Sequence, residues 1–286
     1  SLGLAAGSDA DASATQEKTQ VLRASLLVLD SYAFTPAFAA RLKSPSTRLA
    51  MIDDFAAWPT YPVDVVLNFT ISAPRRDYPV GDARLLLGPT YFPARKAVRD
   101  LARQPRRVAE EPFRICVALS GDINGDAAAT ALEALQSPAF EARVVISPMA
   151  GNRGQVEAAI GAKGAASAVR IAPTDLAIDL AWADVVLCTG GLIKYEAIFL
   201  GAYPLTFSNN AGESEDTLEW SKHGVGEYLG PMAGLSSNRV AAAVAKAVAQ
   251  GPQHLYASSQ RGRAFFSADP AVAAARGLIA HLEQPQ

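Results

Sequence analysis

The residues Thr189-Gly190-Gly191 stand where an apolar run ends and a helical pattern begins, a position suited to binding an anion. The first amides of a helix have no partner within the helix, and they lie at the positive end of its dipole. Glycine lets a phosphate approach such amides closely. Glu196, one turn into the helix, adds a carboxylate that can accept hydrogen bonds from paired hydroxyls, such as those of a ribose. The spacing therefore predicts a diphosphate site with a ribose contact beside it.

A second corner of the same form contains Ser120, Gly121 and Asp122 in the stretch LSGDING. Each corner alone has an ordinary alternative, because adjacent glycines after a strand are most often part of a tight turn. The helix dipole also favours a Glu in an early turn without any ligand. Two such corners in one domain, with Glu196 at a fixed offset from one of them, favour the ligand-binding interpretation. We call them the 120–122 corner and the 189–191 corner.

Apolar runs alternate with helical stretches along the chain, which predicts parallel sheets covered on both faces. Thr35 and Pro36 are expected to begin an early helix as its N-cap and first residue. The expected strands are residues 25–30, 48–53, 63–69, 84–88, 113–119, 142–147, 168–172, 184–189, 203–207 and 225–230. In the second half the expected helices are residues 126–136, 153–162, 174–183, 192–200, 214–223 and 236–250. This order predicts doubly wound α/β sheets that bind ligands at the carboxyl ends of their strands.

The charged, proline-flanked residues 101–113 are expected to separate two domains, residues 1–106 and residues 107–286. We interpret the basic run at residues 103–107 as a solvated linker. A final helix after Pro270 carries an apolar stripe and can pack on either domain.

Composition narrows the possible classes of protein. The chain has 286 residues, of which 50% are hydrophobic and 19% charged, with a net charge of −2, so no basic surface for nucleic acid is expected. Cys116 and Cys188 lie inside apolar runs, which suits a reducing compartment, and the three His are too widely spaced to predict a metal site. No apolar run has the length of a membrane span and no signal sequence is recognisable. We therefore expect a cytoplasmic protein without a metal or other cofactor.

The stretch WADVVLCTGGLIKYEAIFLGAYPLTF, residues 182–207, resembles the nucleotide-binding segment of GT-B-fold proteins. It is most similar to the UDP-sugar hydrolases of the pseudaminic acid pathway, and more distantly to the N-acetylglucosaminyltransferase of peptidoglycan synthesis. Further stretches resemble successive signatures of that hydrolase family: LLVLDSYAF, MIDDFA, DVVLNF, LLLGPTYFPAR, ALSGDING and AVAAARGLI. The resemblance implies two Rossmann-like, doubly wound domains facing a cleft, with UDP on the C-terminal domain and the sugar pointing to the N-terminal one.

The resemblance also implies roles for single residues. The 189–191 corner falls on the family's phosphate-contacting turn and Glu196 on its ribose-contacting acid. The 120–122 corner falls on the first glycine-rich loop of the C-terminal domain, and Asn209 and Asn210 lie near its Asn-Gln element. Tyr32 falls on a tyrosine that the family keeps beside the scissile sugar carbon. An amphipathic residue that closes a strand end is the ordinary alternative for Tyr32.

The sequence departs from the hydrolase pattern in two places. The family opens with a Gly-x-Gly-His loop, whose His is proposed to activate water, but here the three His stand at 223, 254 and 281. We expect His223 to cap the helix before it rather than to act as a base. We also expect an incomplete N-terminal domain, because residue 25 already matches the family's third or fourth strand. The second departure is a set of extra acidic residues, Glu213, Glu215 and Asp216.

The resemblance implies hydrolysis of a UDP-sugar in the biosynthesis of nonulosonic acids or surface glycans. Water would attack the anomeric carbon, and the glycine corners would stabilise the departing diphosphate. Two alternatives stay open at this point. A GT-B glycosyltransferase would use the same UDP site and deliver the sugar to an acceptor hydroxyl. A non-catalytic nucleotide-sugar-binding protein is the other, and the missing His loop favours it.

Overall fold

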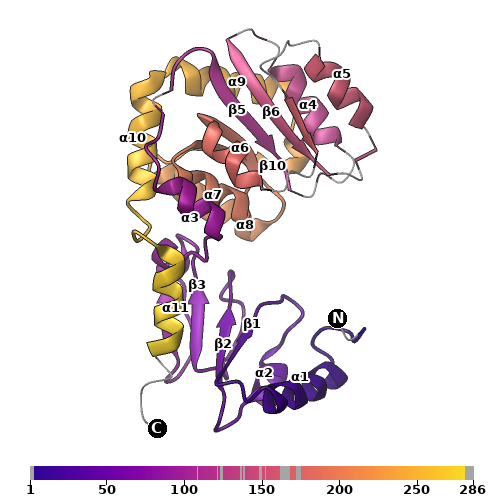
Figure 1. The fold of residues 1–286 in the computed structure, drawn as a ribbon, viewed down its shortest axis with the longest axis vertical. Helices are drawn as coiled ribbons and strands as arrows, with labels where there is room; N and C mark the ends of the chain where they lie inside the picture. The colour runs from indigo at the N-terminus through magenta and orange to yellow at the C-terminus, as the bar shows by residue number, and fades with distance from the viewer. Residues whose placement is uncertain are drawn as a thin grey trace. The chain divides into compact units, whose positions relative to one another are not determined.

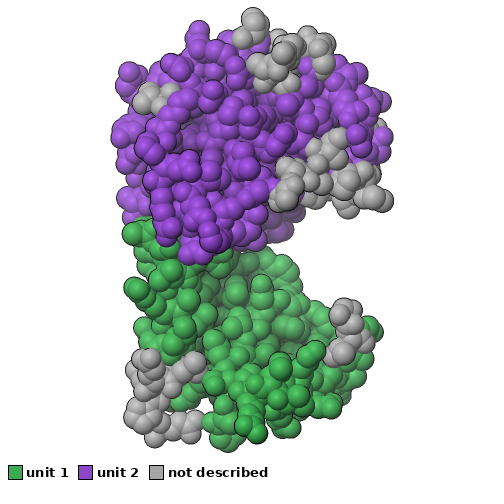
Figure 2. All heavy atoms as spheres, viewed as in Figure 1, with its two compact units in different colours: residues 1–93, 266–286 green, residues 94–265 purple. Residues whose placement is uncertain are grey.

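The computed structural model describes residues 3–107, 109–120, 122, 125–135, 137, 139–147, 150–151, 153–161, 168–171 and 175–280. The chain forms two compact units (Figure 2). Unit 1 consists of Ser1–Pro93 and Phe266–Gln286, and unit 2 of Ala94–Phe265. Unit 2 begins before the expected boundary at residue 106, because helix α3 (Lys96–Ala102) packs on two helices of unit 2, α6 (Leu176–Trp182) and α7 (Leu192–Leu200).

Unit 1 contains a four-stranded parallel sheet in the order β1-β2-β3-β4 (Figure 1). Its strands are β1 (Leu26–Leu29), β2 (Arg48–Ile52), β3 (Val65–Asn68) and β4 (Arg84–Leu87). Its helices and 3₁₀ turns are α1 (Asp9–Val21), α2 (Pro36–Leu42), η1 (Ala73–Arg75), η2 (Pro89–Tyr91) and α11 (Pro270–Ala280).

In unit 1 the structure confirms the predicted start of helix α2 and shows on which unit the final helix packs. The Thr35 hydroxyl accepts a hydrogen bond from the Phe38 amide at 3.2 Å, and Pro36 is the first residue of α2, as expected. The final helix α11 packs on unit 1, where a Cβ at Gly277 would lie 2.8 Å from the Leu86 side chain. A glycine at this position therefore lets the helix approach the sheet.

Unit 2 contains a six-stranded sheet in the order β10-β9-β8-β5-β6-β7, with all neighbours parallel. Its strands are β5 (Phe113–Ala118), β6 (Phe140–Ile146), β7 (Ala168–Ile171), β8 (Val185–Thr189), β9 (Tyr203–Ser208) and β10 (Glu227–Pro231). Counted from β5, the order is 6-5-4-1-2-3, which is the dinucleotide-binding order 3-2-1-4-5-6 seen from the other edge. The doubly wound sheet expected from the sequence is therefore confirmed in this unit.

Helices cover both faces of the unit 2 sheet. Alternate residues such as Ile115, Val117 and Leu187 form one hydrophobic cluster with α4 (Asp126–Ala134), α5 (Arg153–Gly161) and α9 (Ser237–Ala249). Cys116 and Cys188, which alternate with them, are buried on the opposite face and are free thiols. The remaining elements of this unit are α8 (Ala211–Lys222), η3 (Met232–Gly234) and α10 (Gly251–Arg263).

The basic run at residues 103–107 is not the solvated linker that its composition suggested. Arg106 donates hydrogen bonds to the carbonyl oxygens of Ala181, Ala183 and Leu200, at the carboxyl ends of α6 and α7. Burial lowers the pKa of Arg106 to about 10. Arg107 donates to the buried carboxylate of Asp184 at 2.9 Å. The prediction was wrong for Arg106 and Arg107, although residues 103–105 are exposed, because charge content alone does not show which carbonyl and carboxylate groups need donors.

Candidate functional site

The two glycine corners meet at the point where the strand order of unit 2 reverses. Strands β5 and β8 are neighbours in the sheet, with Ala118 paired to Cys188, so the corners follow them at the same edge. Ligands of open α/β sheets bind outside the carboxyl ends of the strands at this reversal. The sequence predicted that each corner follows a strand, and the structure shows that these two strands are neighbours.

At the 189–191 corner, several backbone amides have no hydrogen-bond partner among the described residues. Gly191 is the N-cap residue of α7, and among the described residues no hydrogen bond is found for the amides of Gly191, Leu192 or Ile193. The Thr189 side chain is fully buried, and its hydroxyl has no hydrogen-bond partner in the part of the chain that the structure describes. Buried polar atoms without partners are rare in folded proteins. The amides at the start of α7 are therefore the donors of this corner that suit an anionic ligand, whereas the Thr189 hydroxyl is buried.

The two glycines of this corner have different surroundings. A Cβ at Gly190 would lie 2.7 Å from Glu213 Cβ and 3.1 Å from Thr217 Oγ1, so helix α8 packs directly on this residue. At Gly191 the nearest atom to an added Cβ would be Glu213 Oε1, at 3.9 Å. Gly190 is therefore required by packing, whereas Gly191 leaves room beside the amides.

Glu196 lies on α7 and its carboxylate forms a two-point ion pair with Arg95. Arg95 Nε is 2.7 Å from Oε1 and Nη2 is 2.9 Å from Oε2 of this carboxylate. The Glu196 side chain is only 8% exposed, against 50% for Arg95. The hydrogen bonds to Glu196 raise the pKa of Arg95 above its ordinary value, so the guanidinium stays charged. Nothing in the sequence linked these residues, which stand about a hundred positions apart.

The 120–122 corner contributes to a cavity at the carboxyl ends of β5 and β6. The cavity has a volume of about 270 Å³, and its lining includes Ser120, Asp122, Ser147, Leu176 and Ile193. Its apolar walls and few polar groups are typical of small-molecule sites. Gly121 lies outside the described residues.

The carboxylate of Asp122 has a structural partner. It accepts hydrogen bonds from the amides of Ala127 at 3.2 Å and Ala128 at 2.9 Å, in the first turn of α4. Such a carboxylate satisfies amides that the helix itself leaves unpaired.

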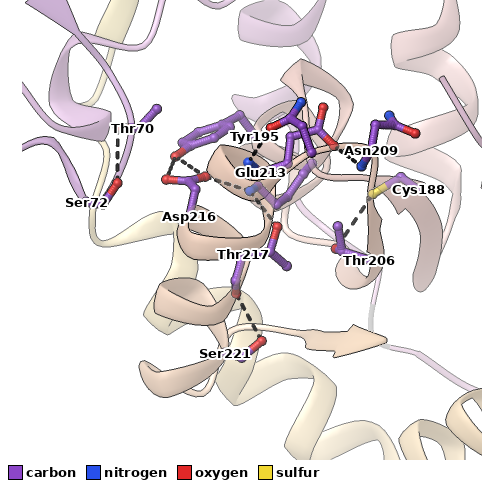
Figure 3. A network of polar contacts seen from close by, with 12 residues as sticks. Thr70, Ser72, Cys188, Tyr195, Thr206, Asn209, Glu213, Asp216, Thr217 and Ser221 are labelled. Carbon is purple, nitrogen blue, oxygen red and sulfur yellow. Dashed lines mark hydrogen bonds and ion pairs between the residues drawn. The ribbon is translucent and has the colours of Figure 1, made fainter. Parts of the chain in front are cut away.

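Asn209 and Asn210 stand where the chain enters α8. The Asn210 side chain is the N-cap of this helix and accepts a hydrogen bond from the Glu213 amide at 2.9 Å. The Asn209 amide donates to Glu213 Oε2 at 2.7 Å, so Glu213 and the two asparagines form a reciprocal capping arrangement (Figure 3). The helix consequently begins at residue 211, three residues before the expected start.

A buried ionic network ties α7 to α8, and the sequence analysis missed it. Lys194 is fully buried, and its Nζ donates to Asp216 Oδ2 at 2.6 Å and to Thr217 Oγ1 at 3.0 Å. Tyr195 also donates its hydroxyl to Asp216, at 2.8 Å (Figure 3). A lysine among the apolar residues of 192–200 was the available signal, because a buried ammonium requires a charged partner. Asp216, one of the extra acidic residues, is that partner.

Tyr32 lies in unit 1, after strand β1. Its side chain is largely exposed, and its hydroxyl donates a hydrogen bond to Asp54 Oδ2 at 2.9 Å. The ring contacts that of Phe55 with centroids 5.3 Å apart. A carboxylate and an aromatic ring thus orient the hydroxyl at the carboxyl edge of the unit 1 sheet.

The two described histidines of unit 2 contact neighbouring side chains, and its two thiols are buried. His223 is the C-cap residue of α8, as expected, with Nε2 3.2 Å from Glu219 Oε1, and His254 contacts the Tyr203 ring. His281 lies outside the described residues. Burial raises the pKa of the Cys188 thiol to about 12 and also raises that of Cys116.

Within the described ranges, no helix is both long and apolar enough for a bilayer crossing.

No protein-family model and no curated protein match the chain. Solved structures do. MurG from Acinetobacter baumannii is 12% identical, with 94% of this chain and 79% of that chain aligned and a TM-score of 0.66. The MnaA–UDP complex from S. aureus is 11% identical over 96% of this chain and 80% of that chain, with a TM-score of 0.63. The spinosyn forosaminyltransferase SpnP is 13% identical over 96% and 81%, with a TM-score of 0.62. At these identities the likeness concerns the fold alone: the chain has a GT-B-like α/β fold with two parallel sheets.

Proposed function

We propose that unit 2 binds a uridine diphosphate sugar at the edge where β5 and β8 end, and that the protein transfers the sugar to an acceptor hydroxyl. The observation that carries the proposal is the meeting of the two glycine corners at the reversal of strand order. The amides at the start of α7, for which the described residues supply no hydrogen-bond partner, support it because they are donors suited to phosphate oxygens.

In this proposal the diphosphate lies beside Gly191, and the amides of the first turn of α7 stabilise its charge. That stabilisation matters most when the bond between the anomeric carbon and the diphosphate oxygen breaks and UDP leaves with extra negative charge. The acceptor hydroxyl forms the new bond to the anomeric carbon and gives its proton to a base. The Glu196 carboxylate accepts hydrogen bonds from the ribose hydroxyls, and the 120–122 corner lines the adjoining cavity.

One similar structure supports UDP as the nucleotide, and another supports sugar transfer as the reaction. One carries UDP, and the other is a forosaminyltransferase. Hydrolysis of the same UDP-sugar is the second candidate, favoured by the sequence resemblance to the pseudaminic acid pathway hydrolases and by the oriented, exposed hydroxyl of Tyr32. In hydrolysis, water takes the place of the acceptor hydroxyl.

The test is to incubate the protein with several UDP-sugars, with and without candidate acceptors, and to measure free UDP and free sugar. UDP release that requires an acceptor supports transfer. Equal amounts of UDP and free sugar without an acceptor support hydrolysis, and binding without turnover supports a sensor or assembly role. Failure to bind any UDP-sugar contradicts both the proposed ligand and the proposed reaction.

A pair of variants tests where the diphosphate binds. Gly191→Val places a branched side chain beside the free amides and should abolish UDP binding while leaving the circular dichroism spectrum unchanged. Gly154→Val is the matched control, because a Cβ at Gly154, on α5, meets no atom within 4 Å. Unaltered UDP affinity in Gly191→Val would remove the diphosphate from this corner.

A further inference from the structure

Arg95 occupies the carboxylate that the proposed function assigns to the ribose. Both oxygens of Glu196 are engaged by the guanidinium, at 2.7 and 2.9 Å. Two parallel N–H···O bonds of this kind are among the stronger and more directional side-chain contacts in proteins. A ribose that donates both hydroxyls to Glu196 must therefore compete with Arg95 or share the carboxylate with it.

The burial of the pair favours competition over sharing. The Glu196 side chain is 8% exposed, so little of the carboxylate can be reached while the guanidinium covers it, whereas half of the Arg95 side chain faces solvent. Arg95 can therefore move into water at much lower cost than Glu196 can.

A second carboxylate lies within reach of the same guanidinium. Arg95 Nη1 is 3.6 Å from Asp175 Oδ1, longer than either contact to Glu196. Asp175 is the N-cap of α6 and accepts a hydrogen bond from the Ala177 amide at 2.9 Å, so its position is fixed. A guanidinium released from Glu196 would keep a charged partner.

We propose that Arg95 is an internal competitor for Glu196: it covers the carboxylate in the free protein and releases it when the ribose hydroxyls bind. This inference rests on the proposed function, because it takes Glu196 as the ribose acceptor. It adds that the ion pair lowers the affinity for the nucleotide, because breaking it offsets part of what the two hydroxyls contribute to binding.

The experiment compares the wild type with Arg95→Met by calorimetric titration of UDP and of its dideoxy analogue, which lacks both ribose hydroxyls. Arg95→Met should bind UDP about tenfold more tightly, because its carboxylate has no competing partner. The affinity for the dideoxy analogue should not change. Arg95→Lys, whose single ammonium cannot make the two-point contact, should show a smaller gain in UDP affinity.

Lys96→Met is the matched control, since it removes the neighbouring positive charge from an exposed pair with Asp100. It should leave both affinities as they are in the wild type. Thermal unfolding of each variant shows whether it is folded. If Arg95→Met fails to fold, Arg95→Lys decides the question alone.

Two results would overturn the inference while leaving UDP binding intact. One is an unchanged or weaker UDP affinity in the folded Arg95 variants, and the other is an equal gain in affinity for both ligands. A wild type and variants that all fail to bind UDP would overturn the inference and the proposed function together.

Discussion

Gly190 and Glu213 are packed so closely that a Cβ on the glycine would lie 2.7 Å from the Cβ of the glutamate. The corner after β8 therefore packs directly against the Glu213 side chain in the first turn of α8. Gly191, the next residue, has no such neighbour, since an added Cβ would lie 3.9 Å from the nearest Glu213 oxygen. Two adjacent glycines thus serve different needs, one of packing and one of access.

This difference predicts opposite outcomes for two matched substitutions. Gly190→Ala should lower the free energy of unfolding by about 1–3 kcal/mol, because the added methyl group forces α8 away from the corner. Gly191→Ala should change it by less than about 0.5 kcal/mol. Urea denaturation of both variants gives the comparison. Equal losses in the two variants would mean that α8 does not rest on Gly190.

The buried Lys194–Asp216 pair predicts a large, partner-dependent loss of stability. Lys194→Met leaves the Asp216 carboxylate buried without its ammonium and should lower the free energy of unfolding by about 3–5 kcal/mol. Lys194→Met/Asp216→Asn should be more stable than the single variant, because the amide removes the charge but still accepts the Tyr195 hydroxyl. Chemical denaturation measures both.

The matched control for that prediction is Lys96→Met, which removes an exposed lysine paired with the exposed carboxylate of Asp100. Exposed pairs contribute at most about 1 kcal/mol, so this variant should resemble the wild type. A double variant no more stable than Lys194→Met would show that the loss comes from packing and not from the unpaired charge.

Asp122 predicts a capping effect at the 120–122 corner. Asp122→Ala removes the acceptor for two amides in the first turn of α4 and should cost about 1 kcal/mol of stability. Asp122→Asn keeps one of the two acceptor oxygens and should retain part of that stability. Thermal unfolding of the two variants tests the assignment, which fails if alanine and asparagine behave alike.

Buried acidic groups predict a loss of stability in alkaline solution. Burial raises the pKa of the Cys188 thiol from 9.0 to about 12 and that of the Tyr78 hydroxyl from 10.0 to about 12. The unfolded chain ionises first, so between these values it binds fewer protons than the folded protein. The free energy of unfolding should therefore be largest below pH 9 and fall as the pH rises towards 12.

Denaturant titrations at a series of pH values measure this slope. Cys188→Ala removes one of the raised groups and should make the decline less steep between pH 9 and pH 12. A decline that is the same in the variant and the wild type would assign it to the other buried groups, and a stability that rises with pH would contradict the burial of all of them.

Local patterns were sufficient for most elements of the fold. The apolar run at residues 184–189 became β8, and Thr35 with Pro36 began α2, because strand burial and helix capping depend on nearby residues. Helix α10 escaped the sequence analysis. It approaches α7 through a glycine, Gly262, whose added Cβ would lie 2.6 Å from Ile198, so small residues replace the apolar stripe that usually marks a helix.

The candidate site was predicted unevenly for a related reason. Glycines after a strand and an acid one turn later are a local pattern, so Gly190, Gly191 and Glu196 could be selected from the sequence. Their partners could not. Arg95 meets Glu196 only because α3 packs on α7, and that contact joins residues far apart in the chain.

The sequence alone determined the order of the strands and of most helices, the two glycine corners and the acid beside one of them, since each follows from residue type and short spacing. Only the tertiary structure decided that the corners meet, that α8 rests on Gly190, that Asp216 neutralises Lys194, and that Arg95 covers Glu196. The physical reason is the distance along the chain over which each interaction acts. Backbone preferences and apolar periods act over a few residues, whereas ion pairs and close packing depend on which distant segments the sheet order brings into contact.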